Sequence, residues 1–315
     1  MDGLLPPKWL QGPPFDVVAV GENSIDLLCV TSSFPAADNK QPLLQRLELP
    51  GGQATTAAVG CARLGLRSCY VGAVGDDANG ARVRETLERE GVAMRVVTRP
   101  GVATRNAVVL IDAGGRRSVL SSRDRRLDIA GGEIDDAIFT SAKLVLVDGS
   151  DLQLSHRAAA AAREAGVPTM CDLDDVSPDA IKLLELIDIV IVPADFVRTA
   201  TGEPSLTAGL RHLAGRSGAE VVVVTDGANG AIGWSAGRVI EVKAEPVRVV
   251  DTTGAGDAFR AGFGAAWLGA AGESLDLIEM VRFAARVAAL NCRDYGAQTA
   301  LPTRAEAGLA GEGWV

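Results

Sequence analysis

The sequence Asp251-Thr252-Thr253-Gly254-Ala255-Gly256-Asp257-Ala258-Phe259 lies between two apolar segments. The β-branched residues 247–250 before it predict a buried strand, and the small apolar residues 258–268 predict a buried helix. A strand, a glycine turn and a helix start together can bind an anion. Glycine lets the backbone approach the ligand closely, and the N–H groups of the first helical turn point toward it. The stretch therefore predicts an anion site.

Asp257 adds a chemical function to this turn, because it falls just inside the expected helix start. A carboxylate there can take a proton from an attacking hydroxyl while nearby amides stabilise charge on a transferring phosphoryl group. Two other glycine-loop sites fit less well. A dinucleotide fingerprint needs a third glycine where Phe259 stands, and a Walker A loop needs Gly-Lys-Ser/Thr. A plain helix-start carboxylate, favoured by the dipole alone, remains the alternative role for Asp257.

Composition limits the class of protein. The 315 residues are 47% apolar with 36 glycines, as expected for one large α/β domain with an appendage. The net charge of −9 and the lack of a long basic cluster argue against nucleic acid as a partner. Five scattered cysteines predict buried, reduced thiols, and two histidines are too few for a typical zinc site. Without a secretory signal or a membrane-spanning run, we expect a cytoplasmic protein with no membrane partner.

The rest of the chain predicts a doubly wound sheet interrupted by a small β excursion. Residues 15–21 form the first expected strand, and polar residues follow it where open α/β sheets bind ligands. Among them, Asp26 is either a ligand contact or an ordinary turn carboxylate. Residues 27–49 break the pattern with two short expected strands, and residues 107–121 predict a hairpin.

Three motifs resemble those of the ribokinase-like (PfkB-type) sugar and nucleoside kinases. Residues 251–259 are similar to the C-terminal signature of that family across nearly its full length. Residues 50–65 resemble the N-terminal signature, with a glycine pair at the start and Arg-Leu-Gly at the end. Thr56, however, stands where the family usually has Asn. Residues 72–77 resemble a Gly-x-x-Gly-Asp-Asp segment.

The resemblance implies a ribokinase-like fold, in which helices flank a doubly wound, mainly parallel sheet that carries a small β-sheet lid. The kinase domain would span residues 15–303, with lid segments at about 27–49 and 104–122. Residues 1–14 would form an irregular N-terminal tail and residues 304–315 a C-terminal tail. Members of that family commonly dimerise through the lid, so we also expect a homodimer.

The implied reaction is transfer of the γ-phosphoryl group of ATP to a primary hydroxyl of a sugar. Asp257 would be the base, the amides of Gly254, Ala255 and Gly256 would form the anion hole, and Mg²⁺ would neutralise the triphosphate. By resemblance, the residues that contact the substrate are Asn23, Asp26, Gly51, Gly52, Gln53, Thr56, Arg105 and Asp148. Those near the nucleotide are Thr225, Gly227, Gly230 and Asn291, and K⁺ would take Asp251 and Thr253 as ligands.

Two departures bear on the substrate. The Asn-x-x-Glu motif of many members is absent from residues 193–198, as it is in ketohexokinase-like members, and residues 34–39 resemble the lid of those members. A ketohexose or fructose-like sugar is therefore the expected substrate, and a nucleoside is the alternative. An anionic sugar is another, if Arg105 or an arginine of residues 123–126 meets its charge rather than pairing with a neighbour. A non-catalytic sugar-binding regulator is the last alternative, although the intact Asp257 argues against it.

Overall fold

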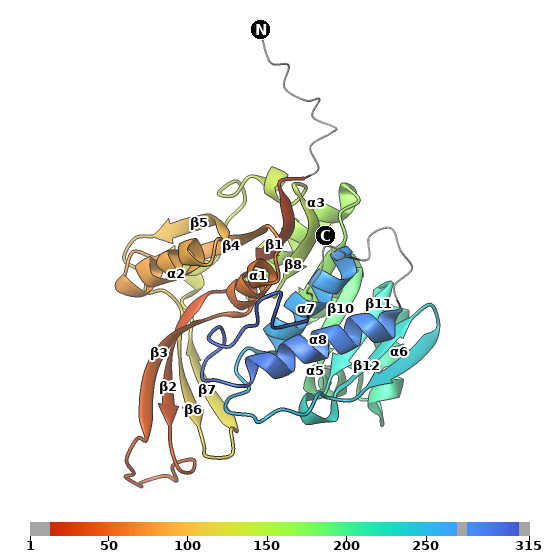
Figure 1. The fold of residues 1–315 in the computed structure, drawn as a ribbon. Coiled ribbons are helices and arrows are strands. Elements are labelled where there is room, and N and C mark those ends of the chain that lie inside the picture. Colours follow the sequence, from red (N-terminus) through yellow and green to blue (C-terminus); the bar gives the residue numbers. More distant parts are fainter. Residues whose placement is uncertain (1–12, 270–275, 309–315) are drawn as a thin grey trace.

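A computed structural model describes residues 13–269 and 276–308 of the chain (Figure 1). A nine-stranded sheet lies between two layers of helices, and a separate four-stranded sheet projects from it. This architecture confirms the predicted fold class, including the small β lid. Most of the predicted tails, residues 1–14 and 304–315, lies outside the described residues.

The main sheet is parallel except at one edge, where its last two strands are antiparallel. Because the parallel strands all end at the same edge, the residues that follow them meet there, as ligand sites in open α/β sheets require. Across the sheet the strands are β13 (Arg238–Val242), β12 (Ala231–Ser235), β11 (Val221–Thr225), β10 (Ile189–Pro193), β9 (Thr169–Asp172), β8 (Ala142–Val147), β1 (Phe15–Val20), β4 (Ser68–Gly75) and β5 (Ala93–Arg99).

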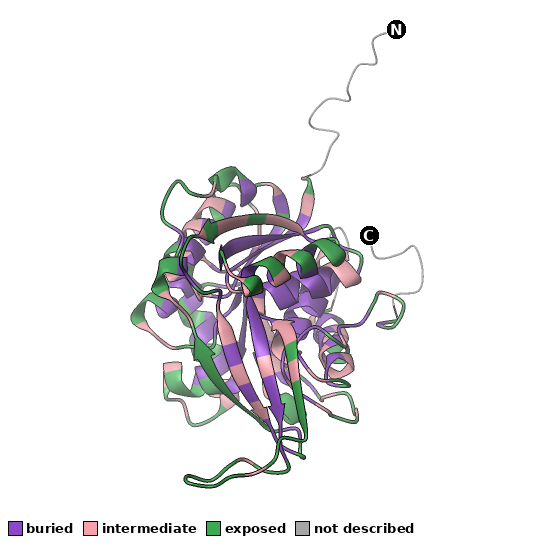
Figure 2. Cartoon of the chain, turned by 90° about the vertical axis from the view of Figure 1, so that its left-hand side faces the viewer, coloured by how far each residue is buried: buried purple, intermediate pink, exposed green. Residues whose placement is uncertain are grey.

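The sheet has a hydrophobic core on each face, because side chains alternate along each strand. In β1, Val17 and Ala19 belong to one core and Val18 and Val20 to the other. Figure 2 shows the buried strands enclosed by helices with exposed outer faces. One core is covered by α1 (Gln53–Arg63), α2 (Ala78–Arg89), α7 (Ala255–Gly269) and α8 (Leu277–Asn291), and the other by α3 (Leu152–Glu164), α4 (Pro178–Leu183), α5 (Ala194–Thr201) and α6 (Leu206–Ser217).

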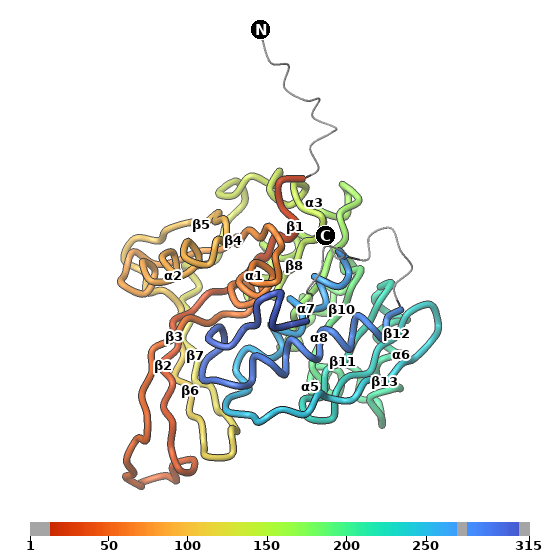
Figure 3. The backbone as a smooth tube through the Cα atoms, in the orientation of Figure 1, coloured from red at the N-terminus to blue at the C-terminus, as the bar shows by residue number. Residues whose placement is uncertain are grey.

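Helix α7 is buried along most of its length because its residues are small and apolar. A Cβ added to Gly262 would lie 3.0 Å from the Cα of Ala284 in α8, so the two helices need glycine at this crossing. The path of the tube in Figure 3 shows α7 running behind α8 toward the sheet. This close packing fixes the first turn of α7, which carries Asp257.

The lid is a mixed sheet in the order β3 (Gln45–Gly51), β2 (Ser24–Val30), β6 (Asn106–Ile111) and β7 (Arg117–Ser122). The two outer pairs are antiparallel and the central pair is parallel. Strand β2 begins four residues after β1 ends, so the lid is attached at the carboxyl edge of the main sheet. Leu28 and Val109 form part of a small apolar cluster on the lid face that also contacts Tyr295.

The predicted buried strand at residues 247–250 is wrong. The chain has no regular structure there, and the side chain of Val249 is 46% exposed. After edge strand β13 the chain has to return across the sheet to reach α7. Among the described residues, no strand pairs with this crossing segment, and its link to the end of α8 is a backbone hydrogen bond from Val250 to Cys292. Among the described residues, no helix is long and apolar enough to cross a membrane.

Candidate active site

The glycine turn before α7 adopts the conformation that its sequence predicts. Gly254 has a φ of +77°, which favours glycine, and its carbonyl accepts the first intrahelical hydrogen bond, from Ala258. The amide of Ala255 donates to the carbonyl of Thr252 over 3.2 Å. The remaining first-turn amides, those of Gly256 and Asp257, have no intrahelical acceptor because of their position. This end of α7 can therefore bind an anion.

Two buried side chains, those of Asp251 and Asn291, stabilise the glycine turn by hydrogen bonds. Asp251 accepts hydrogen bonds from the amide and hydroxyl of Thr253 and from the amide of Gly296. Asn291, at the end of α8, donates to the carbonyl of Thr253 over 3.1 Å. Asn291 was expected near the nucleotide, and the structure places it beneath the glycine turn. Its buried Oδ1 has no hydrogen-bond partner among the described residues.

Asp257 lies in the first turn of α7 and is 9% exposed. Burial raises the pKa of its carboxyl to about 6, although the nearby Arg260 guanidinium acts in the opposite direction. The carboxyl of Asp172, at the end of β9, also acts on the pKa of Asp257. A carboxylate with a pKa near neutrality is well suited to act as a general base.

Asp172 and Arg260 form a buried ion pair next to this carboxyl, with 2.6 Å between Oδ1 and Nη2. Gln53, at the start of α1, donates to Asp172 and to Asp174. The resemblance placed Gln53 at the sugar, and the structure turns its side chain toward the end of β9. Sequence reasoning did not select Arg260, although a lone arginine inside an apolar helix, three residues after Asp257, was a usable signal.

Four of the predicted sugar-binding residues meet where β1 ends and the lid begins. A Cβ added to Gly51 would lie 2.2 Å from a carboxylate oxygen of Asp26, and one on Gly52 would lie 2.5 Å from the Cα of Asn23. The side-chain amide nitrogen of Asn23 donates to the hydroxyl of Tyr70 and the carbonyl of Ala73. The Oδ1 atoms of Asn23 and Asp26 are buried and have no partner among the described residues. These oxygens can accept hydrogen bonds from the hydroxyls of a bound ligand.

The other predicted substrate residues already have partners in the protein. The hydroxyl of Thr56 accepts a hydrogen bond from Gln298 over 3.3 Å. The Asp148 carboxylate accepts hydrogen bonds from three backbone amides, those of Glu22, Ala54 and Ser150, and so joins the end of β1 to the start of α1.

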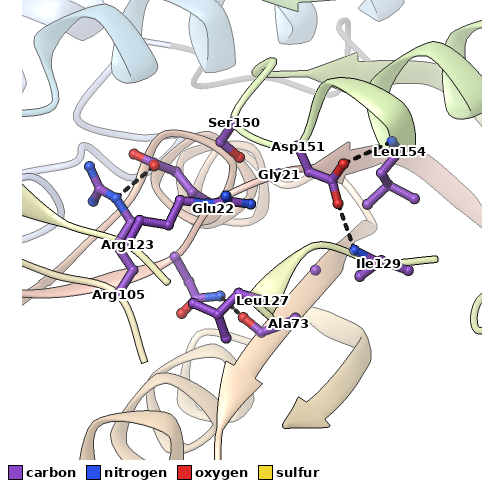
Figure 4. Close-up of a pocket in the computed structure, with 12 residues that line it drawn as sticks. Gly21, Glu22, Ala73, Arg105, Arg123, Leu127, Ile129, Ser150, Asp151 and Leu154 are labelled. Atoms are coloured by element: carbon purple, nitrogen blue, oxygen red, sulfur yellow. Dashed lines mark hydrogen bonds and ion pairs between the residues drawn. The ribbon is translucent and has the colours of Figure 1, made fainter. Parts of the chain in front are cut away.

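Arg105 forms an ion pair with Glu22 at 2.8 Å. In Figure 4 these two side chains point toward one another at a small pocket that Asn23, Arg123 and Asp151 also line. Burial raises the pKa of Glu22, and the adjacent Arg105 guanidinium acts in the opposite direction. Sequence reasoning placed Glu22 in the polar run after β1 but did not select it.

The other three predicted nucleotide residues, Thr225, Gly227 and Gly230, lie two strands beyond β9. Thr225 ends β11, and Gly227 begins the turn that follows, with a φ of +52°. A Cβ on Gly230 would lie 2.1 Å from the carbonyl oxygen of Val242, which explains the glycine. Arg260 binds Asp172 at the end of β9 and the carbonyl of Ile191 in the middle of β10, so the first turn of α7 lies between this turn and the lid. The described residues hold no group of three His, Cys, Asp or Glu side chains that could bind a metal ion.

Comparison with known proteins is consistent with this geometry. Residues 15–304 match the model of the pfkB family carbohydrate kinases. A nucleoside kinase of Methanothermobacter thermautotrophicus is 31% identical over 299 residues, which cover 93% of this chain and 94% of the relative. A fructokinase of Escherichia coli is 30% identical over 311 residues, covering 92% and 97%.

Among solved structures, the Arabidopsis thaliana ribokinase complexed with ribose and ATP has a TM-score of 0.79 and 27% identity, covering 94% of this chain and 98% of that one. The chain therefore belongs to the PfkB family of carbohydrate kinases and is a sugar or nucleoside kinase, a phosphotransferase with an alcohol group as acceptor.

Proposed function

We propose that this protein transfers the γ-phosphoryl group of ATP to a primary hydroxyl of a neutral sugar, with Asp257 as general base. The observation that carries the proposal is the buried Asp257 carboxyl in the first turn of α7, next to the Gly254 turn. ATP is the donor bound in the related Arabidopsis ribokinase structure. The predicted nucleotide residues Thr225, Gly227 and Gly230 lie on one side of Asp257. On the other side lie the Oδ1 atoms of Asn23 and Asp26, which have no partner among the described residues.

Asp257 takes the proton of the sugar hydroxyl, the hydroxyl oxygen forms a bond to the γ-phosphorus, and the bond from that phosphorus to the β,γ-bridging oxygen breaks. ADP leaves with the electron pair of that bond. First-turn amides of α7 stabilise the charge on the transferring group, because they are already oriented before the reaction begins. Asp257 has to be ionised to act, which its pKa of about 6 allows at neutral pH.

The metals of the family are a separate part of the proposal. Among the described residues, no three His, Cys, Asp or Glu side chains are grouped so that they could bind Mg²⁺ by themselves. Mg²⁺ would therefore enter with the phosphates of ATP, as this ion commonly does. For K⁺, the residues fit better: the unpartnered Oδ1 of Asn291 lies at the turn that contains the predicted ligands Asp251 and Thr253. Bound there, K⁺ would neutralise the buried oxygens of this turn.

The substrate class follows from charge and from the lid. Arg105 is paired with Glu22, which disfavours an anionic sugar and favours a neutral one such as a ketohexose. A nucleoside is the second candidate. The partly buried residues at the margin of the apolar lid cluster, Leu47, Leu49 and Tyr295, offer an apolar contact for a base, and one relative is a nucleoside kinase.

The lid also bears on assembly and location. Leu120 on β7 is 65% exposed and Leu44, just before β3, is 63% exposed. Exposed apolar side chains on the lid support the predicted homodimer. The cytoplasmic location remains a prediction.

The test is ADP release against a panel of ketohexoses, aldoses, sugar phosphates and nucleosides, with and without Mg²⁺ and K⁺. We expect turnover on a neutral sugar and a loss of about 10²-fold or more in kcat for Asp257→Asn. Turnover restricted to nucleosides would replace the first candidate by the second. Bound ATP without turnover on any compound would favour the non-catalytic regulator, and full activity of Asp257→Asn would exclude this residue as the base.

A further inference from the structure

The ion pair between Arg105 and Glu22 is largely buried. Its side chains are 16% and 12% exposed, and 2.8 Å separates Nε from Oε2. A guanidinium at this distance favours the ionised form of the carboxyl. A buried pair adds little to stability compared with apolar residues of the same size, because both charges have to leave water. The pair lies directly beside Asn23, one of the predicted sugar residues, so its charges act on whatever binds there.

Hydrogen bonds at and beside each residue of the pair fix its backbone. The amide of Glu22 donates to Asp148 over 2.7 Å. Directly before Arg105, the amide and the hydroxyl of Thr104 donate to Asp77 over 3.0 and 2.6 Å. The pair is therefore in place before a ligand arrives, as a specificity element has to be.

Among the described residues, four charged side chains line the pocket beside this pair, two of each sign: Glu22, Arg105, Arg123 and Asp151 (Figure 4). Arg123 also pairs with Asp128. The two carboxylate oxygens of Asp151 accept from backbone amides over 2.7 and 3.0 Å. The charges of the lining side chains cancel, so the pocket is electrically neutral as long as Glu22 is ionised.

The pocket lies at the end of the site opposite to the candidate base. Its lining includes residues at or near the carboxyl ends of β1, β4 and β8. Asp257 is in α7, whose Arg260 binds the end of β9, beyond β8 in the order of the sheet. Asn23 also lines the pocket, and its buried Oδ1 has no partner among the described residues. A sugar whose acceptor hydroxyl meets Asp257 would therefore direct its other end toward this pocket.

We propose that Glu22 determines the charge of the substrate: by neutralising Arg105, it restricts the far end of the sugar to uncharged groups. This inference deepens the proposed function and rests on it, because it takes Asp257 as the point where the acceptor hydroxyl binds. A carboxylate in the pocket has to compete with Glu22 for the guanidinium, which leaves one of the two anions buried without a cation. A hydroxyl does not compete for the cation and can donate to Oδ1 of Asn23.

The experiment compares D-fructose with two sugar acids, D-fructuronate and 2-keto-D-gluconate. Each acid keeps one primary hydroxyl and carries a carboxylate at the other end of a ketose chain, so together they cover both orientations of the substrate. The wild type should have a lower kcat/KM for both acids than for D-fructose. Glu22→Gln keeps the shape of the side chain and removes its charge, which frees Arg105 for a carboxylate. It should raise the ratio of acid to neutral sugar by about tenfold or more for at least one acid. Dissociation constants from isothermal titration give the same ratio where turnover is slow.

Glu90→Gln is the matched control. Glu90 pairs with Arg63 over the same 2.8 Å, again between Oε2 and Nε, and the two side chains are 17% and 23% exposed. This pair joins the ends of α1 and α2 and does not line the pocket. Its loss should leave the ratio of acid to neutral sugar unchanged. Adding Arg105→Met to Glu22→Gln should remove the gain for the acid, since the cation that binds the carboxylate is then gone.

Two results would overturn the inference while leaving the kinase assignment intact. One is a wild type that prefers either acid to D-fructose. The other is an unchanged ratio in Glu22→Gln protein that melts no lower than Glu90→Gln. If Glu22→Gln does not fold, Arg105→Met decides: an unpaired Glu22 should reject both acids more strongly than the wild type does, and better binding of an acid would contradict the proposal. No turnover on any sugar, or full activity of Asp257→Asn, would instead refute the proposed function, and the titrations would still report on the pocket.

Discussion

Gly254 and Ala297 are in direct contact: a Cβ on Gly254 would lie 2.6 Å from the carbonyl oxygen of Ala297. The loop after α8 therefore packs against the turn that begins α7. The hydrogen bond from the Gly296 amide to Asp251 joins the same two segments over 2.9 Å. As a result, the position of the first-turn amides depends on residues at both ends of the C-terminal helix pair.

Gly254→Ala should damage both stability and catalysis. The φ of +77° is unfavourable for alanine, and the new methyl group would collide with Ala297. We expect a loss of about 2 kcal/mol or more in the free energy of unfolding and about 10²-fold or more in kcat, since the anion-binding amides would move. Urea unfolding and ADP release measure the two effects. Gly218→Ala is the matched control: its φ is +70° and nothing lies within 4 Å, so about 1 kcal/mol and unchanged kcat are expected.

The pH profile should have an acidic limb near pH 6. Burial raises the pKa of Asp257 to about 6, and the base works only when ionised. Below that pH, kcat/KM should fall about tenfold per unit, and above pH 7 the contribution of this group should be constant. Initial rates at constant ionic strength provide the measurement. A profile that stays flat down to pH 5 would contradict the assignment of Asp257.

Asp16→Asn should lower stability at pH 7 but much less in acid. Burial tends to raise the pKa of Asp16, but hydrogen bonds from Arg67 and the charge of Lys143 outweigh it and lower the pKa from 3.8 to about 2. Its stabilising effect is therefore present above pH 3.8 and is lost as the pH falls through 2. We expect a loss of about 1 kcal/mol at pH 7, shrinking toward zero in acid. Chemical denaturation across this range would show it, with the exposed Asp179→Asn as a control that changes little at any pH.

Thr56→Val should weaken sugar binding. The substitution keeps the shape of the side chain but removes the hydroxyl that accepts from Gln298. The buried Oε1 of Gln298 already lacks a partner among the described residues. We expect a cost of about 1–3 kcal/mol in stability and a higher KM for the sugar, with the KM for ATP unchanged. Thr140→Val, at an exposed hydroxyl bonded within its own turn, is the comparison. A stability loss without a change in sugar KM would remove Thr56 from the substrate site.

Local features of the site could be predicted from the sequence. The glycine turn, the start of α7 and the alternation of strands and helices depend on contiguous residues, and the structure bears these out. The strand expected at residues 247–250 could not be judged locally. Apolar, β-branched residues form a strand only where a neighbouring strand can pair with them, and among the described residues no strand pairs with this segment. Likewise, the residues that surround Arg105 in the sequence do not indicate that its side chain pairs with Glu22.

By itself, the sequence determined the family, the doubly wound fold with its lid, and Asp257 at a helix start, because motifs and backbone conformations are encoded in short stretches of chain. Only the tertiary structure decided which charges meet. It brought Asp172, at the end of β9, against Arg260 in the helix that carries Asp257, and it buried all three side chains. Burial and the distances between charges control the pKa of a base, and both arise only when distant segments pack together.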